Sequence, residues 1–498
     1  MDKISINLLV PCVVFHNLDP HTGIPFMPHM AAYLAAKIHS LNKYDLKILD
    51  MFGADSDHIQ KKDNFYVIGL PENKINQYLD LNAKITFIYC RTIEDLFSVE
   101  LLIEYLKKNS KTKIILFENI QTTNSFSLRK IIRYLYDLGT DGLIFGEPEL
   151  IAEDVINYYL LNTIDPNEIP DFSFRTESDF KENAPAPFNK KLDNLSFPLW
   201  EKFQLNGYWK AGFAHPPIHY GDRFLPLLTS RGCPYRCKFC VSPTLNPVWR
   251  SRSADNVVEE IEYFNKKMKI NDFHISDLDP TVNDKRFLEI ANKLIKKNLN
   301  ITWKIAQGTK IETIKNYDAL KIMRDSGLVF FSFSPESGSK KLMKKLNKPF
   351  DYKKSLEVTK ILSNLGVSTQ ACFIAGTPPE TWHDRLLSIF FMVRLVKNGL
   401  SETALFIYSP IPGSHFSSYY DNFKHYSELT RSPTWRKDYI SLLIYRYLMY
   451  SIFFLSKLFF QPWSYFKMIK NILNKNFNTK MEMSFYKLFK IYKMSRKV

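Results

Sequence analysis

The chain has 498 residues, of which 45% are hydrophobic and 24% are charged. A chain of this length is too long for one compact core, and a chain of this composition is not disordered. We therefore expect two or three folded domains. The net charge is +16, and residues 421–498 alone hold fifteen Lys or Arg and four Asp or Glu. The small excess elsewhere argues against a nucleic-acid partner.

Residues 1–160 alternate short apolar runs with segments of helical periodicity. The predicted strands are residues 4–10, 46–49, 85–89, 114–117 and 142–145. The predicted helices are residues 27–38, 99–107 and 128–138. Strands separated by helices of this length predict an α/β domain with a Rossmann-like parallel sheet, whose ligands lie beyond the carboxyl ends of the strands.

Residues 161–222 contain several prolines and little periodicity, which predicts an irregular linker. Alternation returns in residues 223–413. The predicted strands are residues 224–229, 272–276, 301–305, 329–333, 369–374 and 403–408. The helices predicted between them are residues 255–267, 284–297, 313–326, 352–365 and 381–397. Six such repeats predict a partial (β/α)6 barrel of the TIM type, with its chemistry at the carboxyl ends of the strands.

Three cysteines follow the first barrel strand in the pattern C-x3-C-x2-C, at Cys233, Cys237 and Cys240. Cysteine thiolates ligate iron–sulfur clusters, and four of them normally hold one cluster. Zinc favours four ligands, but no fourth Cys lies nearby and the nearest histidine, His219, precedes the three by fourteen residues. The spacing therefore predicts a 4Fe–4S cluster with one iron open to a ligand.

This cysteine loop resembles the signature of the radical S-adenosylmethionine (SAM) superfamily. The resemblance implies that the open iron chelates the amino and carboxylate groups of SAM, and that one electron cleaves SAM to a 5′-deoxyadenosyl radical. Residues 276–279 also resemble the family's acidic loop. The resemblance implies that Phe239 packs near the adenine, that Lys310 faces the cofactor carboxylate, and that Glu336 accepts from its amino or ribose groups. The implied cofactor-binding residues are Phe239, Lys310, Glu336, Ser337, Gly338 and Gly376.

The whole arrangement resembles the cobalamin-binding branch of that superfamily, which includes the anaerobic magnesium-protoporphyrin cyclase and the hopanoid methylases. Residues 25–34, 139–149 and 192–200 carry this resemblance, which implies cobalamin in the N-terminal domain. Two departures weaken it. Residues 50–54 lack the His that ligates cobalamin in some relatives, and residues 118–121 lack a Gly pair. A domain without a cofactor is the alternative.

The resemblance implies a radical SAM enzyme that transfers a methyl group to an unactivated carbon with the help of cobalamin. A radical cyclase or ring-rearranging enzyme of the same branch is one alternative, and a non-catalytic iron–sulfur sensor is another. We expect a small-molecule substrate and an external electron donor such as flavodoxin or ferredoxin. Because the N-terminal residues lack the features of a signal peptide, we expect a cytoplasmic protein.

Residues 414–498 are basic and aromatic, and we expect them to be helical. Residues 438–463 are apolar, but Arg446 and Lys457 leave ten residues between them, fewer than the ~20 that a membrane span needs. Residues 464–475 have the pattern of a basic amphipathic helix. Such a helix either lies on the inner surface of a membrane, which would suit a hydrophobic substrate, or covers the barrel with its apolar side, the commoner use of such a helix.

Overall fold

The computed structural model describes residues 3–18, 25–122, 125–212, 214–219, 222–484 and 486. Residues 1–2 of the predicted N-terminal domain, and residues 485 and 487–498 of the predicted tail, therefore lie outside the described part of the chain.

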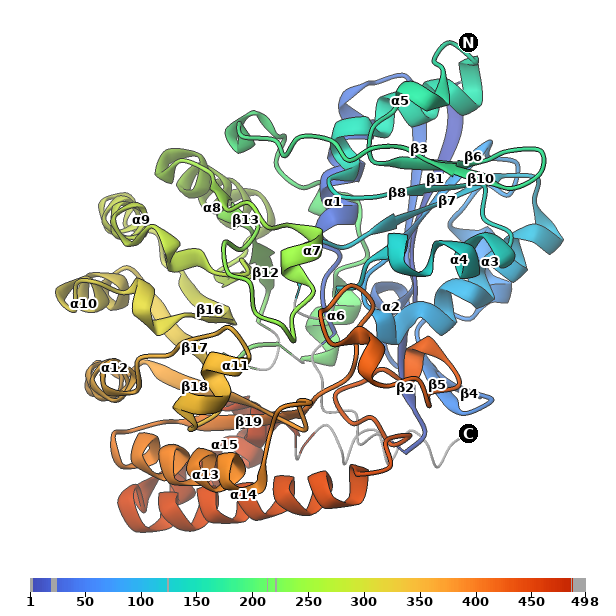
Figure 1. The fold of residues 1–498 in the computed structure, drawn as a ribbon. Coiled ribbons are helices and arrows are strands. Elements are labelled where there is room, and N and C mark those ends of the chain that lie inside the picture. Colours follow the sequence, from blue (N-terminus) through green and yellow to red (C-terminus); the bar gives the residue numbers. More distant parts are fainter. Residues whose placement is uncertain are drawn as a thin grey trace.

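The N-terminal part of the chain forms a sheet with the strand order β10-β9-β8-β7-β6-β1-β3 (Figure 1). Five of its strands pair in parallel, as the sequence predicts: β1 (Ile4–Val10), β3 (Tyr44–Asp50), β6 (Ile85–Cys90), β7 (Lys113–Glu118) and β8 (Gly142–Ile144). Alternate side chains of a strand point to opposite faces. Accordingly, Ile6 and Leu8 pack in the hydrophobic cluster that holds α1 and α5, whereas Leu9 packs in the cluster that holds α3 and α4. These helices span His29–Ser40, Pro148–Leu161, Leu96–Asn109 and Ile132–Asp137.

The predicted linker of residues 161–222 is more ordered than expected. It begins with β9 (Phe172–Arg175) and β10 (Phe180–Glu182), which extend the N-terminal sheet in antiparallel fashion. The buried side chains of Phe172 and Phe174 pack on the sheet, but strands of three or four residues are too short to reveal a period of two. The linker also holds α6 (Asn206–Ala211) and β11 (Ile218–His219). A small antiparallel sheet that was not predicted consists of β2 (Val13–His16), β5 (Phe65–Ile68) and β4 (Ile59–Lys62).

A second sheet contains six parallel strands in consecutive order, which confirms the six predicted repeats. The strands are β12 (Phe224–Leu227), β15 (Asp272–Ile275), β16 (Thr302–Thr309), β17 (Leu328–Glu336), β18 (Ser368–Ala375) and β19 (Glu402–Ile407). The helices around its outer side are α8 (Ala254–Met268), α9 (Asp284–Lys297), α10 (Asp318–Asp325), α12 (Tyr352–Asn364) and α13 (Trp382–Lys397) (Figure 1). Strands β12 and β19 are its two edges, so the sheet forms a partial barrel. Helix α10 begins later than predicted, after a short turn of 3-10 helix over Ile311–Thr313.

The C-terminal segment folds back onto this barrel. Helix α14 (Tyr439–Phe460) packs along α13 and β19, and α15 (Trp463–Asn474) follows it. Strand β20 (Asn476–Phe477) then pairs with β11, so the tail contacts the segment that enters the barrel. The remaining short elements are α2 (Met51–Ala54), α7 (Ser242–Leu245), α11 (Lys340–Lys345), β13 (Ser230–Arg231) and β14 (Arg250–Ser251).

Candidate functional site

The three cysteines lie in a loop that begins at the carboxyl end of β12, where a barrel of this type places its chemistry. The strand pair β13–β14 forms the entry of this loop. Gly232 follows with a φ of 81°, and a Cβ atom there would lie 2.1 Å from the carbonyl oxygen of Val248. Only glycine fits such a position without strain, so the residue before Cys233 fixes the path of the loop.

Backbone hydrogen bonds hold the cysteine loop to distant parts of the barrel. The N–H of Cys233 donates to the carbonyl of Asn246 at 2.9 Å. The N–H of Lys238 donates to the carbonyl of Leu346 at 3.0 Å, and its carbonyl accepts from the N–H of His415 at 3.1 Å. The loop is therefore fixed by chain segments that follow β12, β17 and β19.

The thiols of Cys233, Cys237 and Cys240 are half-buried. Burial, together with the neighbouring thiols, raises the pKa of Cys233 to about 12 and that of Cys237 to about 11. In a 4Fe–4S cluster each cysteine ligates a different iron, so three cysteines would leave one iron without a protein ligand.

Lys348 supplies a buried positive charge beside these thiols. Its Nζ atom lies 2.5 Å from Oε1 of Glu336 and 5.8 Å from the ring centre of Phe239. Although burial lowers it, the pKa of Lys348 is raised on balance by Glu336 and by the Cys237 thiol. In return Lys348 lowers the pKa of Cys237, which favours the thiolate that a metal ligand must be. The sequence analysis missed Lys348, because it lies in a loop far from the cysteines along the chain.

Glu336 ends β17 with a φ of 57°, a left-handed conformation that a non-glycine residue rarely adopts. Strained backbone of this kind gathers at functional sites. The carboxylate is buried, and burial raises its pKa while Lys348 lowers it. The structure thus places this predicted cofactor residue beside the cysteine loop, with Lys348 as its present partner.

Two buried aspartates follow β15 in the predicted acidic loop. Asp277 accepts hydrogen bonds from the N–H and hydroxyl of Thr229 and from the hydroxyl of Ser230, so it fixes the start of the cysteine loop. Asp279 accepts from the hydroxyl of Thr309 at 2.6 Å through Oδ1, whereas its buried Oδ2 has no hydrogen-bond partner within the described part of the chain. Burial raises the pKa of Asp279 to about 6. An unpartnered buried carboxylate oxygen is costly unless a ligand engages it.

The other predicted cofactor residues differ in their surroundings. Lys310 lies beside the cysteine loop, with Nζ 4.2 Å from the ring centre of Tyr235. Phe239 packs against a small hydrophobic cluster that includes Leu342 and Tyr408. Both residues are therefore close to the three thiols.

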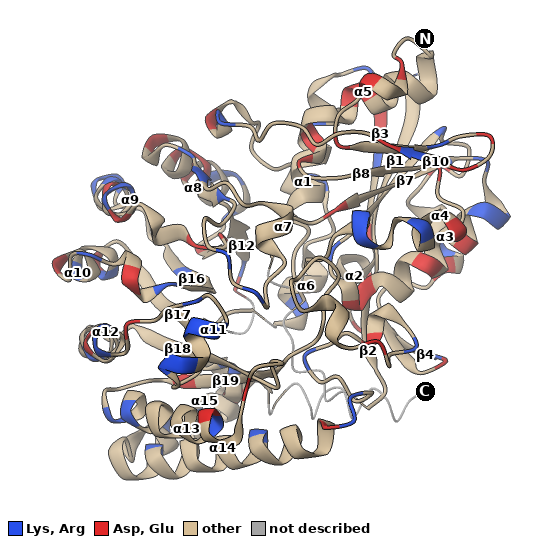
Figure 2. Cartoon of the chain, viewed as in Figure 1, with Lys and Arg blue, Asp and Glu red and all other residues tan. Residues whose placement is uncertain are grey.

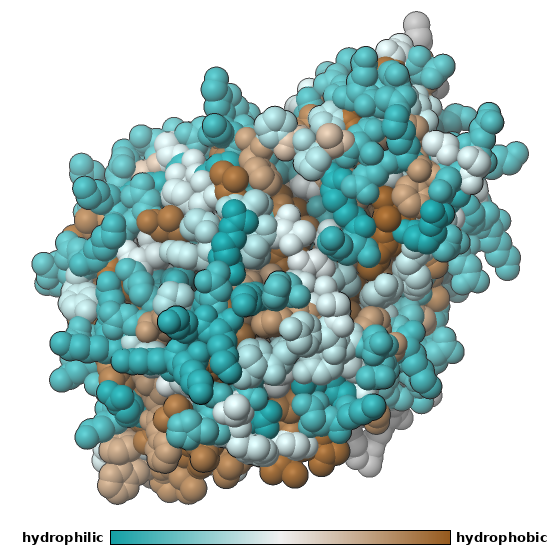
Figure 3. Space-filling view, in the orientation of Figure 1, coloured by the Kyte–Doolittle hydropathy of each residue, from teal (hydrophilic) through white to brown (hydrophobic). Residues whose placement is uncertain are grey.

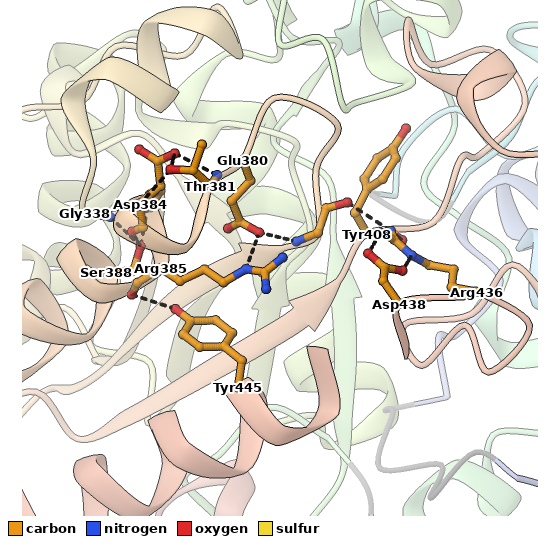
Figure 4. Close-up of polar contacts among 12 residues, drawn as sticks. Gly338, Glu380, Thr381, Asp384, Arg385, Ser388, Tyr408, Arg436, Asp438 and Tyr445 are labelled. Carbon is orange, nitrogen blue, oxygen red and sulfur yellow. Dashed lines mark hydrogen bonds and ion pairs between the residues drawn. The ribbon is translucent and has the colours of Figure 1, made fainter. Parts of the chain in front are cut away.

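Ser337, Gly338 and Gly376 make mainly structural contacts. The hydroxyl of Ser388 on α13 accepts from the N–H of Gly338 at 2.9 Å and lies 2.9 Å from the hydroxyl of Ser337 (Figure 4). The N–H of Gly376 donates to Glu380 at 2.6 Å, and its carbonyl accepts from Arg436 at 3.0 Å. These contacts fix the ends of β17 and β18 against α13 and the tail.

Buried ion pairs join the N-terminal domain to the cysteine loop. Arg231 contacts Glu147 at 2.7 Å and also contacts Glu149, and Arg250 contacts Glu147 at 3.0 Å. Burial works against the charge on Glu147, yet the two arginines hold the pKa of that carboxyl below its usual value. Arg250 also donates to Asn246, whose carbonyl binds Cys233. This chain of contacts therefore fixes Cys233 relative to the N-terminal domain.

At the carboxyl edge of the N-terminal sheet, the chain itself fills the space beyond β3 and β6. Asp50 accepts from the hydroxyl of Tyr208 at 2.9 Å, and Arg91 donates to that hydroxyl at 3.2 Å. The place where some relatives carry a His is taken by buried Phe52, whose ring lies 4.9 Å from that of Tyr208. Gln121, after β7, is fully buried, and neither its Oε1 nor its Nε2 atom has a partner among the residues that the structure describes. A buried amide without a partner is uncommon in a folded protein.

Comparisons with known proteins match the barrel of this chain. The model of the Radical SAM superfamily matches residues 227–392, from the end of β12 into α13. The cytidylyl-2-hydroxyethylphosphonate methyltransferase of Streptomyces wedmorensis is 30% identical over 237 residues, which cover 45% of this chain and 42% of the relative. The anaerobic magnesium-protoporphyrin IX monomethyl ester cyclase of Rubrivivax gelatinosus is 29% identical over 186 residues, which cover 37% of this chain and 33% of the relative. The chain thus matches less than half of the length of either relative.

Among solved structures, the radical SAM methyltransferase TsrM of Kitasatospora setae, with cobalamin and a [4Fe-4S] cluster bound, superposes with a TM-score of 0.62. The superposition covers 84% of this chain and 74% of TsrM at 12% sequence identity. At this identity the likeness establishes the fold alone. It extends over the N-terminal sheet as well as the barrel, since the barrel by itself is less than half of the chain.

Proposed function

We propose that this chain, whose residues 227–392 form a radical SAM domain, holds a 4Fe–4S cluster on Cys233, Cys237 and Cys240 and binds SAM beside it. When bound, such a cluster supplies the electron that cleaves SAM. The observation that carries the proposal is the fixed loop of three thiols at the carboxyl end of β12.

Residues of the barrel have defined tasks in this proposal. Gly232 and the bond from Cys233 to Asn246 hold the loop in one path. Lys348 offsets the negative charge that the thiolates bring into a partly buried site. The Oδ2 atom of Asp279 accepts from the amino group of SAM, which would satisfy a buried acceptor that has no donor among the described residues.

The remaining predicted residues complete the binding site for SAM. Lys310 pairs with its carboxylate, Phe239 packs near its adenine, and Glu336 accepts from its amino or ribose groups. Ser337, Gly338 and Gly376 keep the strand ends in place through their bonds to α13 and the tail. A separate one-electron donor, outside this chain, would reduce the cluster.

We further propose that the N-terminal domain binds cobalamin and that the reaction is methyl transfer to an unactivated carbon of a small molecule. The unpartnered amide of Gln121 at the carboxyl edge of the sheet supports a polar ligand there. Because buried Phe52 stands where some relatives carry a ligating His, the protein would hold cobalamin without a nitrogen ligand from that loop. Methyl transfer is favoured over ring closure because the methyltransferase of Streptomyces wedmorensis matches 237 residues of this chain, whereas the cyclase of Rubrivivax gelatinosus matches 186.

Anaerobic reconstitution with iron and sulfide tests the cluster. We expect iron and sulfide in the ratio of a 4Fe–4S cluster, and a change in the electron paramagnetic resonance spectrum of the reduced protein when SAM is added. Cys237→Ala should lose the cluster, whereas Cys372→Ala, which removes a buried thiol on β18, should keep it. Retention of the cluster in the Cys237 variant would defeat the assignment.

A further inference from the structure

Helix α14 presents its apolar side chains to solvent. The exposed positions recur at helical intervals and, except for Ser451, are apolar: Ile440, Ile444, Tyr447, Leu448, Leu455, Leu458, Phe459 and Phe460. The only charged residues of this helix, Arg446 and Lys457, are both turned toward the protein. This is the reverse of the pattern of a surface helix in a soluble protein, whose polar face meets the water.

Inward polar contacts fix this orientation of α14. The hydroxyl of Tyr445 donates to the carbonyl of Arg385 on α13 at 3.1 Å (Figure 4). Arg446 donates to the hydroxyl of Ser432 at 2.9 Å, and Lys457 donates to the carbonyl of Ser401 at 2.8 Å. Rotating the helix to hide its apolar side would break these bonds and leave buried acceptors without donors.

The two neighbouring helices extend the apolar surface. On α13 the exposed residues include Trp382, Leu386 and Phe390. On α15, which has no buried residue, they include Trp463, Phe466, Ile469 and Leu473, and Trp463 and Leu473 are each 76% exposed. The prediction that residues 464–475 cover the barrel with their apolar side is therefore wrong, because that side of α15 is exposed. Figure 3 shows the resulting brown region at the lower edge of the molecule, where Figure 1 places α13 and α14. Contiguous apolar surface of this kind marks an interaction site.

The charge around this surface is positive. Residues 439–481 contain no Asp or Glu. Lys467 and Lys470 are exposed on α15 beside its apolar residues, and Arg394 and Lys397 are exposed at the end of the α13 stripe. Figure 2 shows α14 almost uncharged, whereas α8, α9, α10 and α12 carry both colours on their outer sides. A basic rim attracts an anionic surface and repels a second copy of the same rim.

Helix α14 is, within the described part of the chain, the one helix long and apolar enough to cross a membrane by length and composition alone. Crossing would strip it from α13 and β19 and place Arg446 and Lys457 in hydrocarbon, at a high energetic cost. A helix that keeps its inward contacts instead lies along the surface, with its apolar side chains among the acyl chains. The two exposed tryptophans, Trp382 and Trp463, suit the interface between water and lipid.

We propose that the apolar face of α13, α14 and α15 seats the barrel on an anionic phospholipid bilayer. The inner side of α14 reaches the strand end described above, since a Cβ atom on Gly376 would lie 2.8 Å from the buried side chain of Leu442. This inference depends on the fold and on the exposed residues, and holds whether or not the protein carries a cluster.

Flotation of the purified full chain with vesicles tests the proposal. We expect binding to vesicles of phosphatidylcholine mixed with phosphatidylglycerol, and weaker binding to phosphatidylcholine alone. The triple variant Ile444→Ser, Leu455→Ser, Phe459→Ser should bind about tenfold less or weaker still, because it removes apolar surface that the bilayer buries. Lys467→Gln with Lys470→Gln should weaken binding to the anionic vesicles only, in a salt-dependent way.

The matched control is Leu161→Ser with Ile295→Ser, which removes exposed apolar side chains from α5 and α9 on other parts of the surface. It should float with anionic vesicles as the wild type does, and circular dichroism should show all variants folded, since every substituted side chain points outward. Equal flotation of the wild type and the triple variant would overturn the proposal. So would a stable dimer in light scattering that the triple variant dissociates, because a second copy would then cover the face.

Discussion

The Nζ atom of Lys348 lies 2.5 Å from Oε1 of Glu336, and both side chains are buried beside the cysteine loop. Neither charge could remain in this place without the other, since an isolated buried charge is strongly destabilising. The pair brings a cation next to Cys237 and leaves the carboxylate at the strand end where the sequence predicts a contact with SAM.

Replacing Lys348 by Met should weaken both the fold and the cluster. Glu336 would be left buried without its partner, at a cost of about 3 kcal/mol in the free energy of unfolding. The Cys237 thiolate would lose the cation that lowers its pKa most, so the iron content after reconstitution should fall. Denaturant unfolding and iron analysis measure the two effects, and Lys348→Arg should restore most of both. If Lys348→Met retains full iron content, Lys348 has no role at the cluster.

The affinity for SAM should depend on the ionisation of Asp279. Burial raises its pKa to about 6, so its carboxyl is protonated below that pH and loses the charge that strengthens its hydrogen bond from the amino group of SAM. In cluster-loaded protein, SAM affinity should therefore rise with pH through about 6, and calorimetry between about pH 5 and 8 measures it.

In Asp279→Asn the affinity should be about tenfold lower at neutral pH, because a charge-assisted hydrogen bond is lost. It should also no longer rise through about pH 6. A variant with the pH profile of the wild type would exclude Asp279 as the acceptor.

Glu147→Gln should loosen the junction between the N-terminal domain and the cysteine loop. Two buried arginines, Arg231 and Arg250, would lose the charge that they share. We expect a loss of about 3 kcal/mol in unfolding free energy and less cluster per chain. Asp179→Asn is the control, since it breaks the exposed pair with Arg133 and should change neither quantity. Equal effects of the two substitutions would contradict the importance of the junction.

Gln121→Leu tests the proposed cobalamin site. The wild-type protein should take up an equimolar amount of hydroxocobalamin, visible in its absorbance after gel filtration. The variant removes the two unpartnered amide atoms at the carboxyl edge of the sheet and should retain much less. Gln77→Leu, at an exposed position, should retain as much as the wild type. If the wild type retains no corrinoid, the N-terminal domain carries no such cofactor.

The features that repeat or cluster along the chain could be predicted from the sequence. Six apolar runs alternating with helical patterns give the barrel strands, and the spacing of Cys233, Cys237 and Cys240 indicates a cluster at the first of them. Strands β9 and β10 could not be predicted, since they are too short to show a period and lie among prolines.

Contacts between residues that are far apart in the chain could not be predicted from the sequence either. Nothing near Lys348 indicates that it lies beside Cys237, more than a hundred residues earlier in the chain. The sequence shows that α14 is apolar. That its apolar side faces the solvent follows only from the hydrogen bonds that Tyr445, Arg446 and Lys457 make toward the protein. Gly376 follows the fifth barrel strand as predicted, yet its contact with Arg436 depends on how the tail folds back.

The most direct test of the central claim is the formation of 5′-deoxyadenosine. Reconstituted protein, given SAM and a strong one-electron reductant without oxygen, should form it, and chromatography with mass spectrometry detects it. Cys237→Ala, treated in the same way, should form none. A wild-type protein that carries a full cluster and binds SAM, yet forms no 5′-deoxyadenosine, would contradict the proposal that the three thiols hold a cluster for SAM cleavage.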